Sequence, residues 1–273
     1  LFGREGELRQ ALAALDEARD GRRIVLVEGE PGIGKTRLVE ELAATAAARG
    51  AAVHWGRAFE GGATPAFWPW LPPLRALVAE AGGAAVPPEL AALVETSGEE
   101  SAAADALGAR FRLFDAVVAL LRAASGRRPL VLVLDDLQWA DLPSLELLGF
   151  VASADALAGA PILLACTVRE LEVGRNDTVV ETLATLSRAP ATRRLTLRGL
   201  PPVAVAELVA VAAGRELPAE VTAAIQERAE GNPFFAAELA RLAADAGGDV
   251  EALGAVSPGG DVPSGVRDVV RRR

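Results

Sequence analysis

The sequence predicts a three-layer α/β/α fold with a central parallel sheet, followed by a small all-helical lid subdomain. Short apolar runs rich in Val, Ile and Leu alternate with helical patterns up to about residue 199. This alternation is typical of a parallel sheet covered on both faces. From about Leu200 the strand signal stops, and three helical patterns follow, each introduced by proline.

Five segments have the length and composition of buried strands, and each is bounded by Gly, Pro or charged residues. They are Ile24–Val27, Ala51–Arg57, Pro129–Asp135, Pro161–Val168 and Arg193–Leu197. Helical spacing of apolar residues predicts helices between and after them. These helices are Lys35–Ala48, Ala103–Ala124, Ser144–Leu157, Pro201–Ala213, Pro218–Ala229 and Pro233–Ala246.

These patterns divide the chain into three parts. Residues 1–199 form the α/β domain, with an insertion at about 58–128; residues 200–246 form the helical lid; residues 247–273 begin as a Gly-rich linker. The last residues, Val262–Arg273, resemble a helix just beginning, although a basic tail that binds nucleic acid is the alternative. Because methionine is absent and the chain opens on Leu1, we expect a piece of a larger protein.

The insertion contains a dense aromatic and prolyl segment, Phe67–Leu74. An exposed surface for a partner is one interpretation. A staple that buries its rings against the following helix, Leu74–Ala79, is at least as well supported.

Composition excludes several classes of protein. The net charge of −9 over 273 residues argues against this segment gripping a nucleic-acid backbone by itself. No apolar run approaches the roughly 18 residues of a membrane span. The single cysteine, Cys166, lies in an apolar run and excludes an internal disulfide. We therefore expect a cytoplasmic protein with no membrane partner.

Residues Gly29–Thr36 read Gly-Glu-Pro-Gly-Ile-Gly-Lys-Thr and stand between an apolar strand and a helix. This is the P-loop pattern, in which backbone N–H groups cradle phosphates, Lys35 reaches the β- and γ-phosphates and the Thr36 hydroxyl ligates Mg²⁺. The sequence thus predicts a P-loop NTPase that binds a nucleoside triphosphate. The residues expected to contact the nucleotide here are Gly29, Pro31, Gly32, Ile33, Gly34, Lys35, Thr36 and Arg37.

Two acidic residues, Asp135 and Asp136, end the third predicted strand. The carboxyl edge of an open α/β sheet is where ligands bind, so Asp135 is expected to hold Mg²⁺ together with Thr36. Asp136 is a candidate to orient or deprotonate the attacking water. Its side chain is one methylene shorter than glutamate, so slow hydrolysis is expected. The alternative, more serious for Asp136, is that the two acids only cap the next helix.

Arg169 ends the fourth predicted strand, at the same edge of the sheet. A delocalised cation there is a candidate to contact the γ-phosphate during transfer. A surface arginine paired with Glu170 or Glu172 is an equally strong interpretation of residue type and position.

Several runs together resemble the signal-transduction ATPases with numerous domains (STAND). They are Leu1–Glu5, Gly29–Thr36, Leu132–Asp141, Thr167–Arg169 and Gly231–Phe235. Within that group the chain is most similar to the AAA-ATPase-like module of large bacterial transcriptional regulators with LuxR-type or SARP-type DNA-binding domains.

The resemblance implies roles that spacing alone does not give. Arg4 would contact the nucleotide, Pro233 would pack against adenine, and Arg169 would be the sensor arginine. The module would switch between an ADP form and an ATP form that self-associates after an unknown inducer is sensed elsewhere. DNA would be bound only through domains absent from this segment, and Val262 would begin a truncated winged-helix domain.

The sequence therefore favours an ATP/ADP-binding switch with Mg²⁺ and weak ATPase activity. Two other functions stay open. One is a ring-forming remodelling ATPase, which needs fast hydrolysis. The other is the same module in a regulated nucleotide cyclase or a kinase.

Overall fold

The computed structural model describes residues 1–61, 65–82, 86–96, 106–169, 177–189 and 191–247. The expected linker and truncated winged helix at 247–273 lie outside these residues, apart from Gly247. Within the described chain, no helix is both long and apolar enough to cross a membrane.

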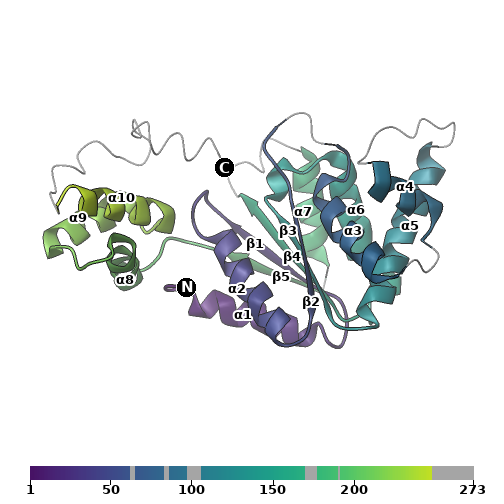
Figure 1. Cartoon of the computed structure of the whole chain (residues 1–273), viewed down its shortest axis with the longest axis horizontal. Helices are drawn as coiled ribbons and strands as arrows, with labels where there is room; N and C mark the ends of the chain where they lie inside the picture. Colours follow the sequence, from purple (N-terminus) through teal and green to yellow (C-terminus); the bar gives the residue numbers. More distant parts are fainter. Residues whose placement is uncertain (62–64, 83–85, 97–105, 170–176, 190, 248–273) are drawn as a thin grey trace. The chain divides into compact units, whose positions relative to one another are not determined.

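A five-stranded parallel sheet confirms the predicted fold class (Figure 1). Its strands are β1 (Arg23–Gly29), β2 (Ala52–Arg57), β3 (Leu130–Asp135), β4 (Ile162–Arg169) and β5 (Thr192–Thr196). Their order is β2-β3-β4-β1-β5, and every neighbouring pair is parallel. Each strand lies within a residue or two of the segment that its Val, Ile and Leu content predicts.

The α-helices connect these strands and then continue alone after β5. They are α1 (Glu5–Glu17), α2 (Lys35–Ala48), α3 (Leu71–Glu80), α4 (Pro88–Thr96), α5 (Ala106–Ser125), α6 (Leu142–Ser153), α7 (Asp177–Arg188), α8 (Pro202–Ala213), α9 (Ala219–Ala229) and α10 (Pro233–Asp245). Helix α6 begins earlier than expected, because Asp141 caps it by accepting from the Ser144 N–H, and Pro143 fits the first turn. It also ends at Ser153, before a separate short 3-10 turn, Asp155–Leu157.

Contacts divide the chain into two compact units. The first comprises Leu1–Gly6, Glu30–Lys35 and the chain from Leu197 onward, and the second comprises Glu7–Gly29 and Thr36–Thr196. The helical unit has its own core, which includes Val205, Val221, Ile225 and Leu239. The domain limits expected from the sequence stay a prediction, and the first unit also takes in two short segments that precede β2.

Alternation along the strands assigns the two faces of the sheet. In β3 and β4, Leu132, Leu134, Leu164 and Cys166 join the core formed with α3, α5, α6 and α7. The residues between them point to the opposite face, where α2 lies (Figure 1). This alternation decides which residues at the strand ends share a face with the beginning of α2.

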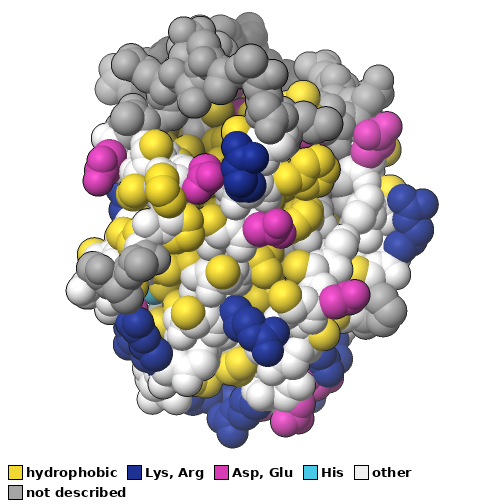
Figure 2. All heavy atoms as spheres, turned by 90° about the vertical axis from the view of Figure 1, so that its right-hand side faces the viewer, with side chains coloured by type: hydrophobic (Ala, Val, Ile, Leu, Met, Phe, Trp, Pro, Cys, Tyr) yellow, Lys and Arg dark blue, Asp and Glu magenta, His cyan; other side chains and the backbone are white. Residues whose placement is uncertain are grey.

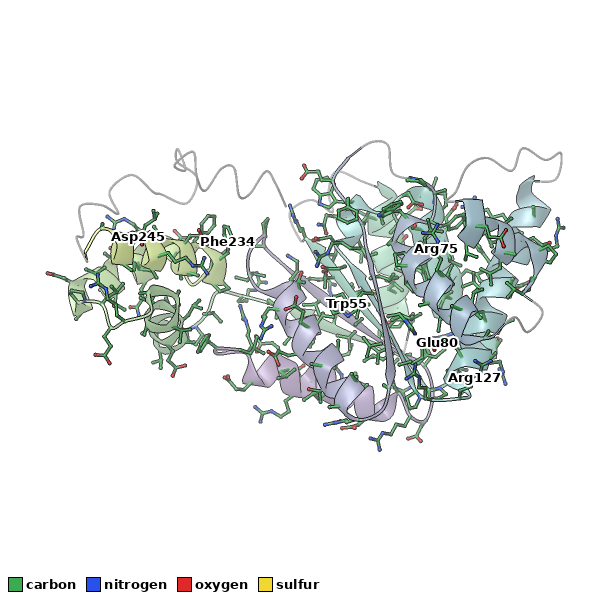
Figure 3. All side chains as sticks on the ribbon, in the orientation of Figure 1. Trp55, Arg75, Glu80, Arg127, Phe234 and Asp245 are labelled. Carbon is green, nitrogen blue, oxygen red and sulfur yellow. The ribbon has the colours of Figure 1, made fainter. Side chains whose placement is uncertain are left out.

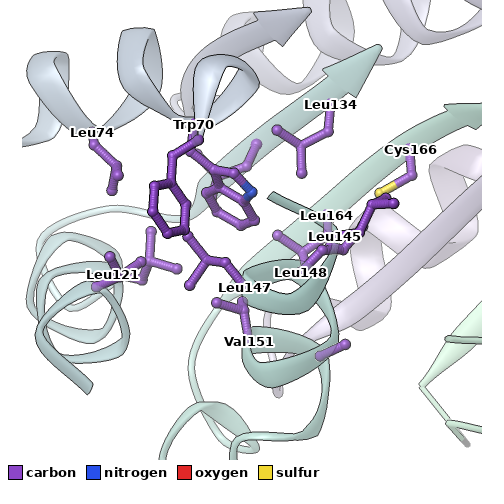
Figure 4. Packing of buried hydrophobic residues seen from close by; sticks show 14 of the residues in the cluster. Trp70, Leu74, Leu121, Leu134, Leu145, Leu147, Leu148, Val151, Leu164 and Cys166 are labelled. Atoms are coloured by element: carbon purple, nitrogen blue, oxygen red, sulfur yellow. The ribbon is translucent and has the colours of Figure 1, made fainter. Parts of the chain in front are cut away.

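The aromatic segment before α3 is a buried staple. Trp70 is 0 % exposed, and its Nε1 donates to the Ser144 carbonyl at 3.1 Å. Figure 4 shows its ring packed among leucines of α3, α5 and α6. Gly56 of β2 is required beneath it, since a Cβ there would lie 1.6 Å from the Pro69 carbonyl oxygen. The segment thus closes the core, as the second interpretation of its sequence expected.

The α4 and α5 end of the second unit carries side chains of mixed type. Phe111 of α5 is 52 % exposed. Arg112 of α5 pairs with Glu89 of α4 at 3.1 Å. Figure 2 shows hydrophobic, basic and acidic side chains interspersed on the face viewed from this end.

The buried ring of Trp70 predicts a large cost of truncation. We expect Trp70→Ala to lower the free energy of unfolding by about 3–5 kcal/mol, because it leaves a cavity and removes a buried hydrogen bond. Phe59→Ala, at a side chain 49 % exposed, should cost no more than about 1 kcal/mol. Urea unfolding followed by circular dichroism measures both, with Trp70→Phe as the milder variant. Equal costs at the two sites would contradict the staple.

Candidate functional site

The tip of the glycine loop, Glu30–Lys35, folds within the first unit. Gly32 and Gly34 have φ of 76° and 100°, which residues with a Cβ rarely adopt. Lys35 is 6 % exposed, and its Nζ donates to the Glu30 carbonyl across the loop at 2.9 Å. Ile33 is buried. The loop conformation therefore depends on its glycines and on its own lysine.

Asn232, which precedes α10, joins this loop to the helical unit. Its Nδ2 donates to the Pro31 carbonyl at 2.9 Å, while its Oδ1 accepts from the Phe234 N–H at 3.1 Å and so caps α10. Figure 3 labels Phe234 at the start of this helix. A Cβ on Gly32 would lie 2.8 Å from the Phe234 Cβ. Close approach of the Phe234 side chain thus explains Gly32 as well as its φ does.

Arg4 and Pro233 also lie beside the loop. Arg4 is 4 % exposed, and its Nη2 donates to the Ile33 carbonyl at 3.2 Å and to the Arg198 carbonyl. Pro233 occupies the first turn of α10, and its Cγ would lie 3.8 Å from a Cβ on Gly34. Both residues implied by the resemblance therefore contact or flank the loop itself. Their contacts with a nucleotide stay predictions.

In the second unit, Arg57, Asp135 and Thr167 form a row across β2, β3 and β4. Arg57 pairs with Asp135 in the register of β2 and β3, and Leu134 pairs with Cys166 in that of β3 and β4. Asp135 is therefore level with Thr167. Alternation puts all three side chains on the face of the sheet where α2 begins.

Asp135 is the best-connected side chain of this row. It is 0 % exposed. Its Oδ1 accepts from Thr167 Oγ1 at 2.6 Å and from Thr36 Oγ1 at 3.1 Å. Its Oδ2 accepts from Arg57 Nε at 2.9 Å. Burial of this carboxylate is tolerated because both oxygens are hydrogen bonded and one faces a cation.

Thr36 and Asp135 fit a magnesium ion chemically. A hydroxyl and a carboxylate 3.1 Å apart are the hard oxygen donors that Mg²⁺ prefers, and one or two such ligands suffice, since Mg²⁺ keeps several waters. No cluster of three or more His, Cys, Asp or Glu residues suited to a metal occurs in the described chain. Any metal carried there would depend on few protein ligands and on the phosphates of a nucleotide.

Asp136 is held in an unusual backbone conformation. Its φ of 61° lies in the left-handed region, which Asp and Asn adopt more readily than other residues with a Cβ. The Thr167 hydroxyl accepts from its N–H at 2.9 Å. Gln138 Nε2 donates to Asp136 Oδ1 at 2.9 Å, so one of its two oxygens is already engaged. A strained turn that fixes a carboxylate at a sheet edge is typical of functional sites.

Arg169 belongs to the same group of side chains. Its Nε lies 4.0 Å from Asp136 Oδ1, and its guanidinium stands 5.6 Å from the centre of the Trp139 ring. Its backbone N–H donates to Gln138 Oε1 at 3.0 Å. Glu170 and Glu172, the alternative partners, lie outside the described residues. Its contact with the γ-phosphate stays a prediction.

Arg37, which the sequence predicts to contact the nucleotide, takes no part in these contacts. Arg37 is exposed and pairs with Glu40 and Glu41 on α2, at 3.1 and 2.5 Å. Its expected role in nucleotide binding is not supported by these contacts and stays a prediction.

Cys166 is a buried structural cysteine, as its apolar run in the sequence indicates. Burial raises the pKa of its thiol to about 12, so the thiol stays protonated.

Residues 1–165 match the family of AAA ATPase domains. The chain belongs to this family. A curated relative is an uncharacterized protein of Rhizobium meliloti (strain 1021), 30 % identical over 191 residues. The match covers 62 % of the chain, which itself spans only 18 % of the length of that relative.

Several solved structures share the fold at low identity. Cdc6p of Pyrobaculum aerophilum aligns with a TM-score of 0.57 and 17 % identity, over 89 % of this chain and 61 % of that one. A Walker-type ATPase of Pyrococcus abyssi aligns at 0.54 and 16 %, over 93 % and 71 %. The ORC2 protein of Aeropyrum pernix, solved as ADPNP-ADP complexes, aligns at 0.52 and 17 %, over 100 % and 69 %. At these identities the likeness shows the fold alone.

Several contacts at the site were not expected from the sequence. They include Thr167 on Asp135, Arg57 on Asp135, Gln138 on Asp136 and Asn232 on Pro31. Arg57 could have been found from its place at the end of the strand before β3, since parallel strands end at one edge. Gln138 and Asn232 belong to recognisable motifs, but nothing in those motifs predicts the residues that they contact.

The two hydrogen bonds of Asn232 can be separated by one substitution. Asn232→Asp keeps an acceptor for the Phe234 N–H but removes the donor to the Pro31 carbonyl. We expect hydrogen exchange of residues 30–35 to accelerate about tenfold, while α10 stays protected. Exchange read by mass spectrometry measures this. Unchanged protection of the loop in the variant would show that Asn232 does not anchor it.

Proposed function

We propose that this chain is an ATP/ADP-binding switch module with slow Mg²⁺-dependent hydrolysis. The hydrogen bond between Thr36 and Asp135, 99 residues apart, carries this proposal. It joins the last residue of the glycine loop to the acid that ends β3, which is the pairing that a Mg²⁺-nucleotide requires. Membership of the AAA ATPase domain family supports the same ligand class.

Phosphate binding follows from the loop and the helix after it. The N–H groups of the glycine loop and the positive end of the α2 dipole attract an anion, and Lys35 adds a full positive charge. Lys35 Nζ donates to the Glu30 carbonyl, and a phosphate would offer it a charged acceptor. We expect adenine to be the base, since the resemblance assigns Pro233 to it.

Slow turnover follows from the surroundings of Asp136. One of its oxygens is engaged by Gln138, and its backbone is fixed in the left-handed region. An aspartate held in this way reaches less far toward a water than a free glutamate would. We therefore expect ATP hydrolysis to be slower than in a motor ATPase. Slow hydrolysis favours a module whose conformation depends on which nucleotide is bound.

The wider context is a multidomain, signal-responsive transcriptional regulator of the STAND type. The Asp-Asp-Leu-Gln-Trp-Ala-Asp and Gly-Asn-Pro-Phe-Phe runs support this assignment. Self-association in the ATP form, an inducer and DNA binding would all reside in the full-length protein. A regulated cyclase or kinase that carries the same module remains the second candidate, and a ring-forming remodelling ATPase the third.

Nucleotide binding is tested directly with the chain itself. We expect labelled ADP and ATP to bind saturably, and Lys35→Ala to weaken binding at least about a hundredfold, because a charged contact to phosphate is lost. Fluorescence anisotropy measures the affinities. Arg49→Ala, at an exposed pair with Asp16, is the matched control and should bind as the parent does. Absence of saturable binding to the parent chain would reject the proposal.

The role of Asp136 is tested by an isosteric change. Asp136→Asn suits the same backbone conformation and should leave ADP affinity within about twofold, while turnover falls about tenfold or more. Phosphate release under single-turnover conditions measures the rate. If the variant hydrolyses ATP as fast as the parent, Asp136 does not act on the water. A parent rate of several per second, stimulated by a polymer, would instead favour the remodelling ATPase.

A further inference from the structure

Arg57 forms the only ion pair that the structure gives to Asp135 among the described residues. Its Nε and Nη2 lie 2.9 and 2.7 Å from Asp135 Oδ2. The carboxylate is fully buried, whereas 48 % of the arginine side chain is exposed. One end of this pair is thus fixed in the protein interior, and the other can leave toward solvent.

The backbone of β2 delivers Arg57 to this position. Arg57 is in register with Asp135, and the next residue, Ala58, donates its N–H to the Asp135 carbonyl at 3.0 Å. Close passage of Pro69 over Gly56 fixes the same end of the strand from the opposite face. Trp55, labelled in Figure 3, precedes it on the face of the sheet that carries α2. The backbone at Arg57 is thus held in place, whereas 48 % of its side chain is exposed.

The Arg57 guanidinium and a metal ion are alternative cations for the buried Asp135 carboxylate. A buried carboxylate without a nearby cation is strongly destabilised. Arg57 supplies that cation on the Asp135 oxygen, Oδ2, that lies beside the Thr36 hydroxyl at 3.2 Å. A divalent ion held by Thr36 and Asp135 would place two further positive charges at the same carboxylate. Because like charges at such distances repel, each cation weakens the hold of the other.

We propose that Arg57 is a stand-in cation, which neutralises Asp135 when no metal is present and gives way to the Mg²⁺ that arrives with the nucleotide. This proposal rests on the proposed function and adds a positioning residue to it. Metal-free nucleotide leaves the ion pair in place, whereas the Mg²⁺ complex must displace it. Arg57 therefore reduces the gain in nucleotide affinity that Mg²⁺ provides, and it stabilises the metal-free protein.

The experiment compares ADP affinity in EDTA with ADP affinity in Mg²⁺, by anisotropy of labelled ADP. The quantity compared is the dissociation constant of ADP in EDTA divided by that in Mg²⁺. In Arg57→Gln we expect this ratio to rise about tenfold over the parent, because Mg²⁺ no longer has to displace a charge-assisted hydrogen bond. Arg57→Lys keeps the charge and should return the ratio toward the parent value. Thermal unfolding is a second readout. The Tm of Arg57→Gln should fall in EDTA and recover with Mg²⁺ and ADP.

Arg194→Gln is the matched control. Arg194 of β5 is likewise half-exposed and pairs with a buried acid, Glu28, at 2.6 Å, and neither residue is among the proposed metal ligands. This variant should lower the Tm in EDTA without changing the ratio of dissociation constants. A ratio in Arg57→Gln equal to that of the parent, or lower, would overturn the proposal. Failure of the parent chain to bind ADP at all would instead reject the nucleotide site itself.

Discussion

Asp135, a fully buried carboxylate at the carboxyl end of the central strands, is the constraint on which the site of the second unit depends. Leaving such a group without partners would cost several kcal/mol, a large share of the stability of a typical domain. Thr167 and Arg57 reach it only because β2, β3 and β4 are in one register. Thr36 reaches it from the start of α2. Contacts with this one carboxylate therefore connect β2, β3, β4 and the start of α2.

The loop in the first unit has a different kind of constraint. Its conformation requires glycines at 32 and 34, and its carbonyls are held by Arg4 and Asn232. These donors occupy carbonyl groups of the loop. A nucleotide that reorients this loop would also act on the start of α10, because Asn232 belongs to both. Such a link is what a nucleotide-dependent switch needs.

Much of the fold could be predicted because burial repeats along the strands. The run from Leu130 to Asp135 reads as a buried strand without any knowledge of its neighbours. Likewise, Thr36 and Asp135 were expected to meet, since both follow parallel strands at one edge. Their roles toward a metal and a nucleotide nevertheless stay predictions.

The contacts that could not be predicted from the sequence are pairs of residues brought together by strand register and by packing. Arg57 looks like the polar end of any strand until β2 is aligned with β3. The Asn232 contact joins residues 201 positions apart, and nothing in either motif encodes the partner. The early start of α6 was missed for a local reason: Asp141 was read as part of a motif and not as a helix cap.

The claim that Thr36 and Asp135 hold the metal of a bound nucleotide can be tested with Mn²⁺ as a paramagnetic substitute for Mg²⁺. Electron paramagnetic resonance reports the free ion. With free Mn²⁺ kept below the concentration that ADP alone binds, we expect the chain and ADP together to remove up to about one Mn²⁺ per molecule from the free pool, and Asp135→Asn to abolish this gain while still binding ADP. An equal loss of free Mn²⁺ with the parent and with Asp135→Asn would contradict the account.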